Sequence, residues 1–208
     1  GSLDNMVKKV SNGEIPDDWE TIKAITIIGI AAGMAYIHQH NILLGNLRTD
    51  TIFYDEKNHP KIVSFTVAFN LKNGQKCEFV TLNNIPLYTS PEEINGDDLS
   101  NKVDVYSFSI VLYSILTLKM PFDDMKEINV FRFLNSISNG KRPSIEKKEI
   151  NNNFKELLES CWNQNPENRP TFANIVQKLI SEKNKFFDMD SINVKMLDDY
   201  IVEVTKNL

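Results

Sequence analysis

The chain has 208 residues, of which 41% are hydrophobic and 25% charged, and its formal net charge is −5. This length and composition suit one globular domain with its own core, and the acidic balance argues against non-specific nucleic-acid binding, which needs a basic surface. The two cysteines, Cys77 and Cys161, lie far apart and show no zinc-binding spacing. We therefore expect no disulfide framework, no structural metal site and a reducing, cytoplasmic compartment.

The sequence has no signal-peptide pattern, and its most apolar stretch, residues 24–37, is too short to span a bilayer. We expect no membrane segment in this chain. The chain could still be the intracellular part of a larger protein, with its attachment upstream.

The first part of the chain predicts two helices. Ser2 and Asp4 are placed to cap a helical turn that reaches residue 10. From residue 16 onwards, apolar side chains recur at steps of three and four, the pattern of a helix packed on a core. Within it, Gly29 and Gly33 indicate a close approach by a neighbouring element.

Strand signals and further helices follow. Residues 52–54 and 61–63 predict a β-hairpin around a polar turn, and residues 70–85 predict a long loop. The remaining predicted helices cover residues 103–118, 129–138, 154–162, 172–180 and 192–204. The first of these is apolar nearly all round and should be central. For the last, Asp190 or Ser191 is the expected cap.

Several segments then give a more specific pattern. They are LLGNLRTDTIFYD (43–55), KIVSF (61–65), YTSPEEI (88–94), DVYSFSIVLYSIL (104–116), PF (121–122), NGKRP (139–143) and CWNQNPENRPTF (161–172). In this order, they resemble the C-terminal lobe of a protein kinase, with an ending most similar to the tyrosine-kinase and tyrosine-kinase-like groups.

The resemblance implies a mainly α-helical, kinase-like C-lobe with a small β-hairpin over residues 1–185, and a helical extension over residues 186–208. The chain has no glycine-rich loop and no V-A-I-K strand, so the resemblance also implies that the N-lobe is absent. The missing initiator methionine agrees with a cut near the kinase hinge.

The catalytic motifs of the family are altered. The loop H-R-D-L-x-x-x-N matches residues 44–51, with Asn46 at the catalytic aspartate and Thr51 at the magnesium-binding asparagine. The D-F-G motif matches residues 64–66, with Ser64 at the magnesium-binding aspartate. A neutral amide cannot accept the substrate proton, and a serine offers Mg²⁺ no anionic oxygen. The resemblance therefore predicts no catalytic residue, no metal site and no cofactor.

Other polar residues near the loop do not replace these groups. Asp50 and Asp55 are interpreted as turn residues or solvated carboxylates. His38, His40 and His59 are interpreted as ordinary helix-end and turn histidines, because no serine or cysteine partner stands in a nucleophile motif.

Positions that stabilise the family's fold remain. Glu92 and Arg169 match a buried ion pair, and Asp104 matches an aspartate that binds the backbone of the catalytic loop. Phe53 falls beneath the adenine site, where it would form a vestigial floor.

The resemblance therefore implies a pseudokinase lobe that serves as a signalling, scaffold or regulatory module and binds protein partners. Self-association through the surface left by the N-lobe is one form of this, and we expect that surface to be exposed and apolar around Leu43, Phe53 and Phe65. The alternative at this surface is that the loop at residues 70–85 or the C-terminal tail covers it. The alternative is the C-lobe of an atypical kinase that uses ATP and Mg²⁺ to phosphorylate serine, threonine or tyrosine. A purely structural domain is the third interpretation.

Overall fold

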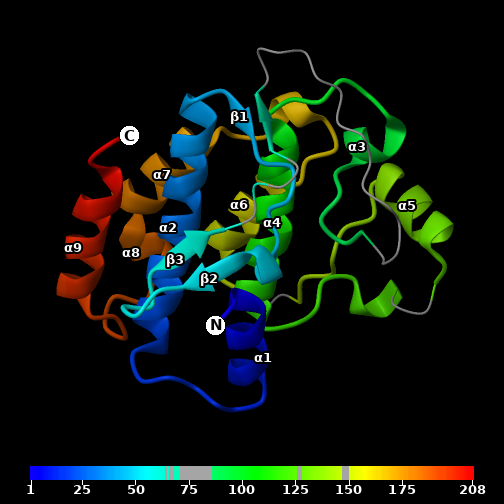
Figure 1. The fold of residues 1–208 in the computed structure, drawn as a ribbon. Helices are drawn as coiled ribbons and strands as arrows, with labels where there is room; N and C mark the ends of the chain where they lie inside the picture. Colours follow the sequence, from blue (N-terminus) through cyan, green and yellow to red (C-terminus); the bar gives the residue numbers. More distant parts are fainter. Residues whose placement is uncertain (64, 66–67, 71–85, 126–127, 147–149) are drawn as a thin grey trace.

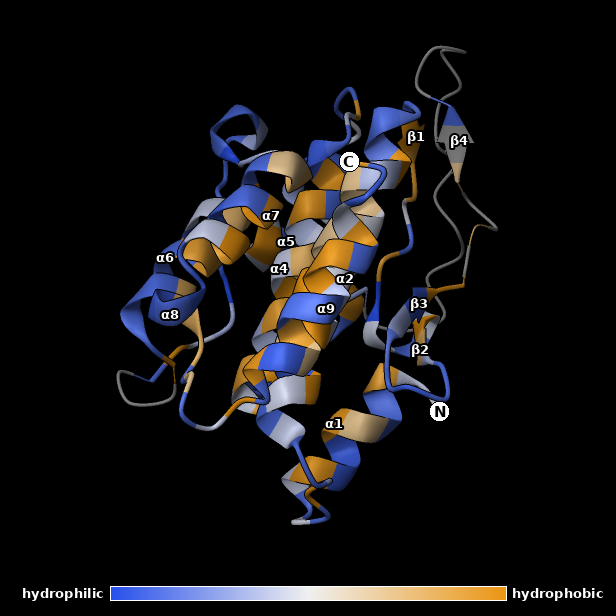
Figure 2. Cartoon of the chain, turned by 90° about the vertical axis from the view of Figure 1, so that its left-hand side faces the viewer, coloured by the Kyte–Doolittle hydropathy of each residue, from blue (hydrophilic) through white to orange (hydrophobic). Residues whose placement is uncertain are grey.

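Two long apolar helices, α2 (Trp19–Gln39) and α4 (Lys102–Thr117), form the centre of the molecule (Figure 1). This computed structural model describes residues 1–63, 65, 68–70, 86–125, 128–146 and 150–208. Figure 2 shows hydrophobic residues along both helices, while the surrounding helices carry hydrophilic residues as well. Because α4 is apolar on nearly every side, it can be stable only where other elements cover all of its faces, as predicted.

Shorter helices surround this centre. They are α1 (Leu3–Ser11), α3 (Pro91–Asn95), α5 (Val130–Ser138), α6 (Asn152–Cys161), α7 (Phe172–Ser181), α8 (Lys183–Phe186) and α9 (Val194–Thr205), with short 3-10 helices at Thr49–Thr51, Asp123–Met125 and Pro166–Asn168. Helices α7 and α9 pack along α2, α6 packs on α4, and α3 lies against α5. The predicted fold class, mainly helical with a small antiparallel sheet, is confirmed.

The predicted β-hairpin is formed by β2 (Ile52–Tyr54) and β3 (Pro60–Ile62), with Ile52 opposite Ile62. Asp55 closes its turn, because the carboxylate accepts hydrogen bonds from the backbone N–H of Lys57 and of His59, both at 2.9 Å. Burial opposes ionisation of this carboxyl, but these bonds and nearby Lys61 outweigh it and lower the pKa of Asp55.

A second, unpredicted sheet pairs β1 (Ile42–Leu43) with β4 (Phe69–Asn70). Two-residue strands separated by more than twenty residues carry too little periodicity to be recognised. The loop predicted for residues 70–85 lies outside the described residues, except for Asn70.

The cap of α1 agrees with the prediction from the sequence, whereas the cap of α9 differs from it. At α1, Ser2 Oγ accepts a hydrogen bond from Asn5 N at 3.3 Å, as predicted. At α9, the prediction of Asp190 or Ser191 is wrong, because the helix begins at Val194 and Asn193 therefore precedes it. The Asn193 side chain accepts from Met196 N at 3.1 Å.

Helix α9 lies directly on α2 at Gly29. A Cβ atom at this glycine would stand 2.1 Å from the Tyr200 hydroxyl oxygen and 2.6 Å from Cγ of Pro60. The backbone N–H of Asn193 also donates to Thr21 Oγ1 at 2.9 Å. Since Leu197 is fully buried, the residues after position 185 share the core of the preceding helices.

Among the described residues, α2 is the one helix long and apolar enough by length and composition to cross a membrane. The helix is longer than the apolar stretch at residues 24–37, because it also includes a more polar turn at each end. Burial within the fold covers 78% of its most apolar window. Burial of this extent is typical of a helix at the centre of a folded core.

Candidate functional site

The segment that matches the catalytic loop is held by Asp104, in the first turn of α4. Its two carboxylate oxygens accept hydrogen bonds from Leu44 N at 2.9 Å and from Gly45 N at 2.8 Å. The Asp104 side chain is fully buried. The sequence predicts a contact of Asp104 with this backbone, and the structure brings these residues together.

His38 completes this cluster. Its Nε2 lies 2.9 Å from Oδ2 of Asp104, and both side chains are buried. From the sequence, His38 is interpreted as an ordinary helix-end histidine, so this contact was not predicted. The two residues are 66 positions apart, and only the packing of α2 beside α4 brings them together. Its position at the end of an apolar helix was the available signal.

Gly45 gives the loop a backbone that other residues adopt only with strain. Its φ angle is +68°, in the left-handed region. The family has arginine at this position in H-R-D, so the glycine removes a cationic side chain as well as a steric restriction.

Thr51 closes the loop on itself. Its hydroxyl oxygen accepts from Arg48 N at 3.1 Å, and it lies 3.0 Å from the backbone oxygens of Asn46 and Arg48, to which it donates. The hydroxyl is thus committed to the backbone of residues 46–51. Thr51 contacts Asn46 by donating its hydroxyl proton to the backbone carbonyl oxygen of Asn46.

Asp50 is held by a neighbouring arginine. Its carboxylate accepts hydrogen bonds from Nε and Nη2 of Arg48, both at 2.9 Å. Both side chains are exposed. The hydrogen bonds that Arg48 donates to the Asp50 carboxylate raise the pKa of Arg48. The Arg48 guanidinium also lies over the ring of Tyr88, 5.5 Å from its centroid. This places Asp50 in a surface ion pair.

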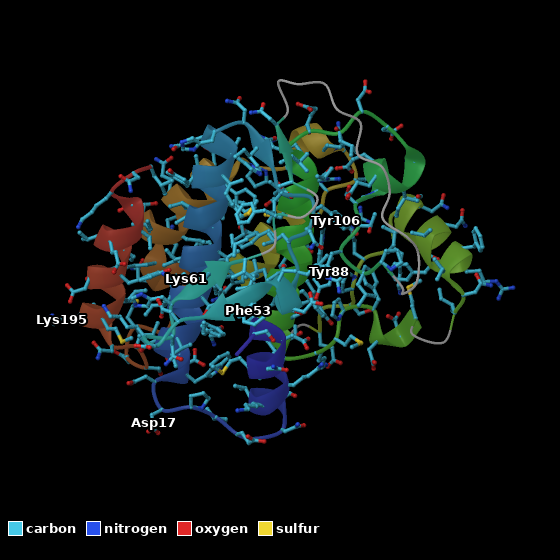
Figure 3. All side chains as sticks on the ribbon, viewed as in Figure 1. Asp17, Phe53, Lys61, Tyr88, Tyr106 and Lys195 are labelled. Atoms are coloured by element: carbon cyan, nitrogen blue, oxygen red, sulfur yellow. The ribbon has the colours of Figure 1, made fainter. Side chains whose placement is uncertain are left out.

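Tyr88 links the loop to the segment before α3. Its hydroxyl lies 2.9 Å from Thr49 Oγ1. Burial raises the pKa of the Tyr88 phenol. Figure 3 shows Tyr88 on one side of α4 and Phe53 on the hairpin.

The predicted apolar surface is exposed only in part. Phe53 and Phe65 are 42% and 48% exposed, whereas Leu43 is fully buried. The prediction of an exposed Leu43 is therefore wrong. The reason is that β1 pairs with β4 and packs against α2. Ser64 lies outside the described residues.

Glu92 in α3 and Arg169 form a buried ion pair. Nη1 and Nη2 of Arg169 lie 2.5 and 2.8 Å from the two carboxylate oxygens. Nε donates to the Asn163 carbonyl at 2.9 Å, and Nη1 also donates to that of Lys102 at 3.0 Å. Removing one partner of such a pair costs about 3–5 kcal/mol, because a charge is left buried.

Tyr106 lies beside this pair, and two guanidinium groups lie over its ring. The carbon centres of Arg142 and Arg169 stand 5.1 and 5.3 Å from its ring centroid. Burial raises the pKa of Tyr106 to about 12. Its hydroxyl is buried and has no hydrogen-bond partner within the described part of the chain. Nothing in the sequence indicated this arrangement.

Across the described ranges, no group of three or more histidine, cysteine, aspartate or glutamate side chains is arranged to hold a metal ion. Of the two cysteines, Cys161 is described; it is free and buried, and burial raises its pKa to about 12.

The comparisons with known proteins agree with this architecture. A family model described as protein tyrosine and serine/threonine kinase matches residues 1–179. The chain is 32% identical over 154 residues to RGS domain-containing serine/threonine-protein kinase A of Dictyostelium discoideum, covering 74% of this chain and 13% of that protein. Serine/threonine-protein kinase STY17 of Arabidopsis thaliana is 32% identical over 154 residues, covering 73% of this chain and 26% of that protein.

Dual specificity protein kinase shkD of Dictyostelium discoideum is 32% identical over 151 residues, covering 72% of this chain and 20% of that protein. The chain thus spans about a quarter or less of the length of these relatives. The family match extends from α1 into α7, through the loop held by Asp104 and the Glu92–Arg169 pair. The chain belongs to the protein tyrosine and serine/threonine kinase family.

Proposed function

We propose that this chain is a catalytically impaired, pseudokinase-like C-lobe that acts as a signalling, scaffold or regulatory module by binding other proteins. The observation that carries the proposal is a contrast. Contacts that hold the scaffold together are present at Asp104 and at the Glu92–Arg169 pair. The polar groups of phosphoryl transfer are replaced at Asn46, Thr51 and Ser64.

The replacement of the base is the first support. In the family, the aspartate of this loop accepts the proton of the substrate hydroxyl. An amide such as Asn46 cannot, and a lost general base lowers the rate by about 10²–10⁴. Asp50, four positions further on, is no substitute, because both of its oxygens are bound by Arg48.

The donors at the metal positions also do not fit Mg²⁺. This ion prefers carboxylate oxygens and binds through them together with substrate phosphates. Thr51 offers a neutral hydroxyl that already bonds with the loop backbone. Serine at position 64 supplies no charge. We therefore propose that the chain uses neither ATP nor Mg²⁺, and that Phe53 is a vestige of the adenine floor.

The exposed apolar side chains of the hairpin region support a binding role. Phe53, Val63 and Phe65 are 42%, 53% and 48% exposed. This surface would face an N-terminal lobe in a two-lobed kinase, and we propose that it contacts a protein partner or a second copy of this chain. A cytoplasmic location is part of the same proposal.

A phosphotransfer assay tests the proposal. The full-length protein that contains this chain is incubated with radiolabelled ATP, Mg²⁺ and casein, beside its Asn46→Ala variant. We expect incorporation at the level of the protein-free blank for both. Turnover in the wild type that Asn46→Ala abolishes would contradict the proposal.

A nucleotide-binding assay distinguishes this proposal from the alternative, an atypical kinase that transfers phosphate from ATP to proteins. The melting temperature of the full-length protein is measured with ATP, with and without Mg²⁺. We expect no Mg²⁺-dependent rise. A rise that Thr51→Ala or Ser64→Ala removes would favour the atypical kinase.

A further inference from the structure

A surface groove of about 730 Å³ lies beside α5, on the opposite side of the molecule from α9 (Figure 1). Met125 and Ile128 contribute apolar side chains to its lining. Arg132, Asn135 and Asn139 contribute one face of α5 and its cap, at steps of three and four residues. Lys141, two residues after this cap, also lines the groove. The groove is remote from the loop held by Asp104.

The edge of this groove carries the most exposed large hydrophobic residue of the described chain. Phe131 is 80% exposed and lies one turn before Asn135, so it flanks the lining face of α5. An aromatic side chain this exposed next to an apolar floor is typical of a contact surface for another protein.

The charges at the groove are cationic. The Arg132 side chain is exposed, and within the described ranges no carboxylate forms an ion pair with its guanidinium. The ammonium of Lys141 pairs with Asp124 at 2.8 Å, but both side chains are exposed, and such surface pairs are weak and exchange easily. A carboxylate entering the groove would therefore meet the exposed guanidinium of Arg132 and the exchangeable ammonium of Lys141.

The segment that follows α5 is held against the end of the helix. The backbone N–H of Lys141 donates to the Ser136 carbonyl at 2.9 Å, and Nη1 of Arg142 donates to the Ile137 carbonyl at 3.2 Å. Nε of Arg142 donates to the Trp162 carbonyl at 2.9 Å. A segment already held in place reduces the ordering that binding would require.

We propose that this groove binds an acidic peptide segment of a partner protein, with a carboxylate on Arg132 and an apolar side chain against Phe131 and Ile128. Asn135 and Asn139 are amides, which have the donors and acceptors to bind a peptide backbone. Self-association through the groove is an outcome that the light-scattering measurement below distinguishes. The inference rests on the proposed binding role and specifies a site and a partner class for it.

Peptide selection tests the site. The purified protein is presented with a phage-displayed library of random linear peptides, and enriched peptides are measured by fluorescence polarisation. We expect enrichment of peptides that combine aspartate or glutamate with an apolar residue. Arg132→Glu and Phe131→Ala should each weaken binding by about tenfold or more. Both residues are exposed, so these variants should fold.

Matched controls lie on α9. Lys195→Glu makes the same charge reversal at a side chain that is 87% exposed and far from the groove (Figure 3), and Val202→Ala removes an exposed apolar side chain. Both should bind the selected peptides as the wild type does.

Failure to enrich acidic peptides, or equal binding by Arg132→Glu, would overturn the site. A dimer in light scattering that Phe131→Ala dissociates would overturn it in favour of self-association. The phosphotransfer assay reports separately on the proposed function.

Discussion

Tyr106 carries a buried hydroxyl with no hydrogen-bond partner in the described part of the chain. A buried hydroxyl without a partner costs about 1–3 kcal/mol relative to one in water. Tyr106→Phe removes the hydroxyl and keeps the ring beside Arg142 and Arg169. We expect the free energy of unfolding in urea to stay unchanged or to rise by about 1 kcal/mol.

Tyr54 is the matched control. Its hydroxyl lies 3.0 Å from Thr26 Oγ1, and burial raises its pKa to about 12, as for Tyr106. Tyr54→Phe leaves Thr26 without this partner and should lower the free energy of unfolding by about 1 kcal/mol. Equal losses in both variants would mean that the Tyr106 hydroxyl has a partner in solution, such as a buried water.

We expect Glu93 to make the stability of the domain depend on pH between about 4.5 and 7. Burial raises the pKa of its carboxyl to about 7, although hydrogen bonds from Ser90 N and Oγ, at 2.7 and 2.6 Å, lower it. The charges of Glu92 and Asp104 raise it further. A raised pKa means that the folded state binds the proton more tightly than the unfolded state. The resulting stability is fully present below about pH 4.5 and is lost as the pH rises through about 7.

Glu93→Gln measures this effect, because it keeps a carbonyl oxygen for Ser90 and does not titrate. The measured quantity is the free energy of unfolding of the wild type minus that of the variant. This difference should fall as the pH rises from about 5 to about 8. Urea titrations at several pH values check the slope. A difference that is constant with pH would show that Glu93 titrates normally.

At the scale of elements, the contact between α9 and α2 depends on Gly29. A methyl group there would meet Tyr200 and Pro60 at distances where atoms overlap, so α9 or the hairpin must move. Overpacking of this kind costs about 1–3 kcal/mol. We expect Gly29→Ala to lower the midpoint of urea unfolding.

Gly33, one turn further along α2, is the internal control. A Cβ atom there would meet only the terminal Cδ1 of Ile62, at 3.3 Å, and this side chain can shift. Alanine also favours a helix by about 1 kcal/mol over glycine. Gly33→Ala should therefore be neutral or stabilising. If both substitutions cost the same, the contact of α9 with α2 is looser than described.

Periodic elements were predictable because their physics is local. The α2 and α4 helices and the β2–β3 hairpin follow from the spacing of apolar residues and from turn chemistry. Contacts between distant segments were harder. The His38–Asp104 bond and the burial of Leu43 by the β1–β4 pair depend on how complete elements pack. Asp104 and the Glu92–Arg169 pair were predicted only because the chain resembles a known family.

At the scale of the whole molecule, the segment after residue 185 is part of the packed core. Phe186 and Phe187 lie against Phe154, with ring centroids 5.0 and 5.5 Å away. Further on, Leu197 and Tyr200 are buried where α9 covers α2. Burial of a large apolar side chain contributes about 1.5–3 kcal/mol, so α9 is a substantial part of the total stability.

A chain that ends at residue 191 tests this contribution. It lacks Ile192, Leu197 and Tyr200, and it exposes the apolar face of α2 around Gly29. We expect the free energy of unfolding to fall by about 4 kcal/mol or more, and an apolar dye to bind to the shortened chain. A chain that ends at Thr205 loses only the three exposed residues after α9 and should unfold within about 0.5 kcal/mol of the full chain. If removing α9 leaves stability and dye binding unchanged, α2 is covered without it, and α9 is free to leave the lobe and bind elsewhere.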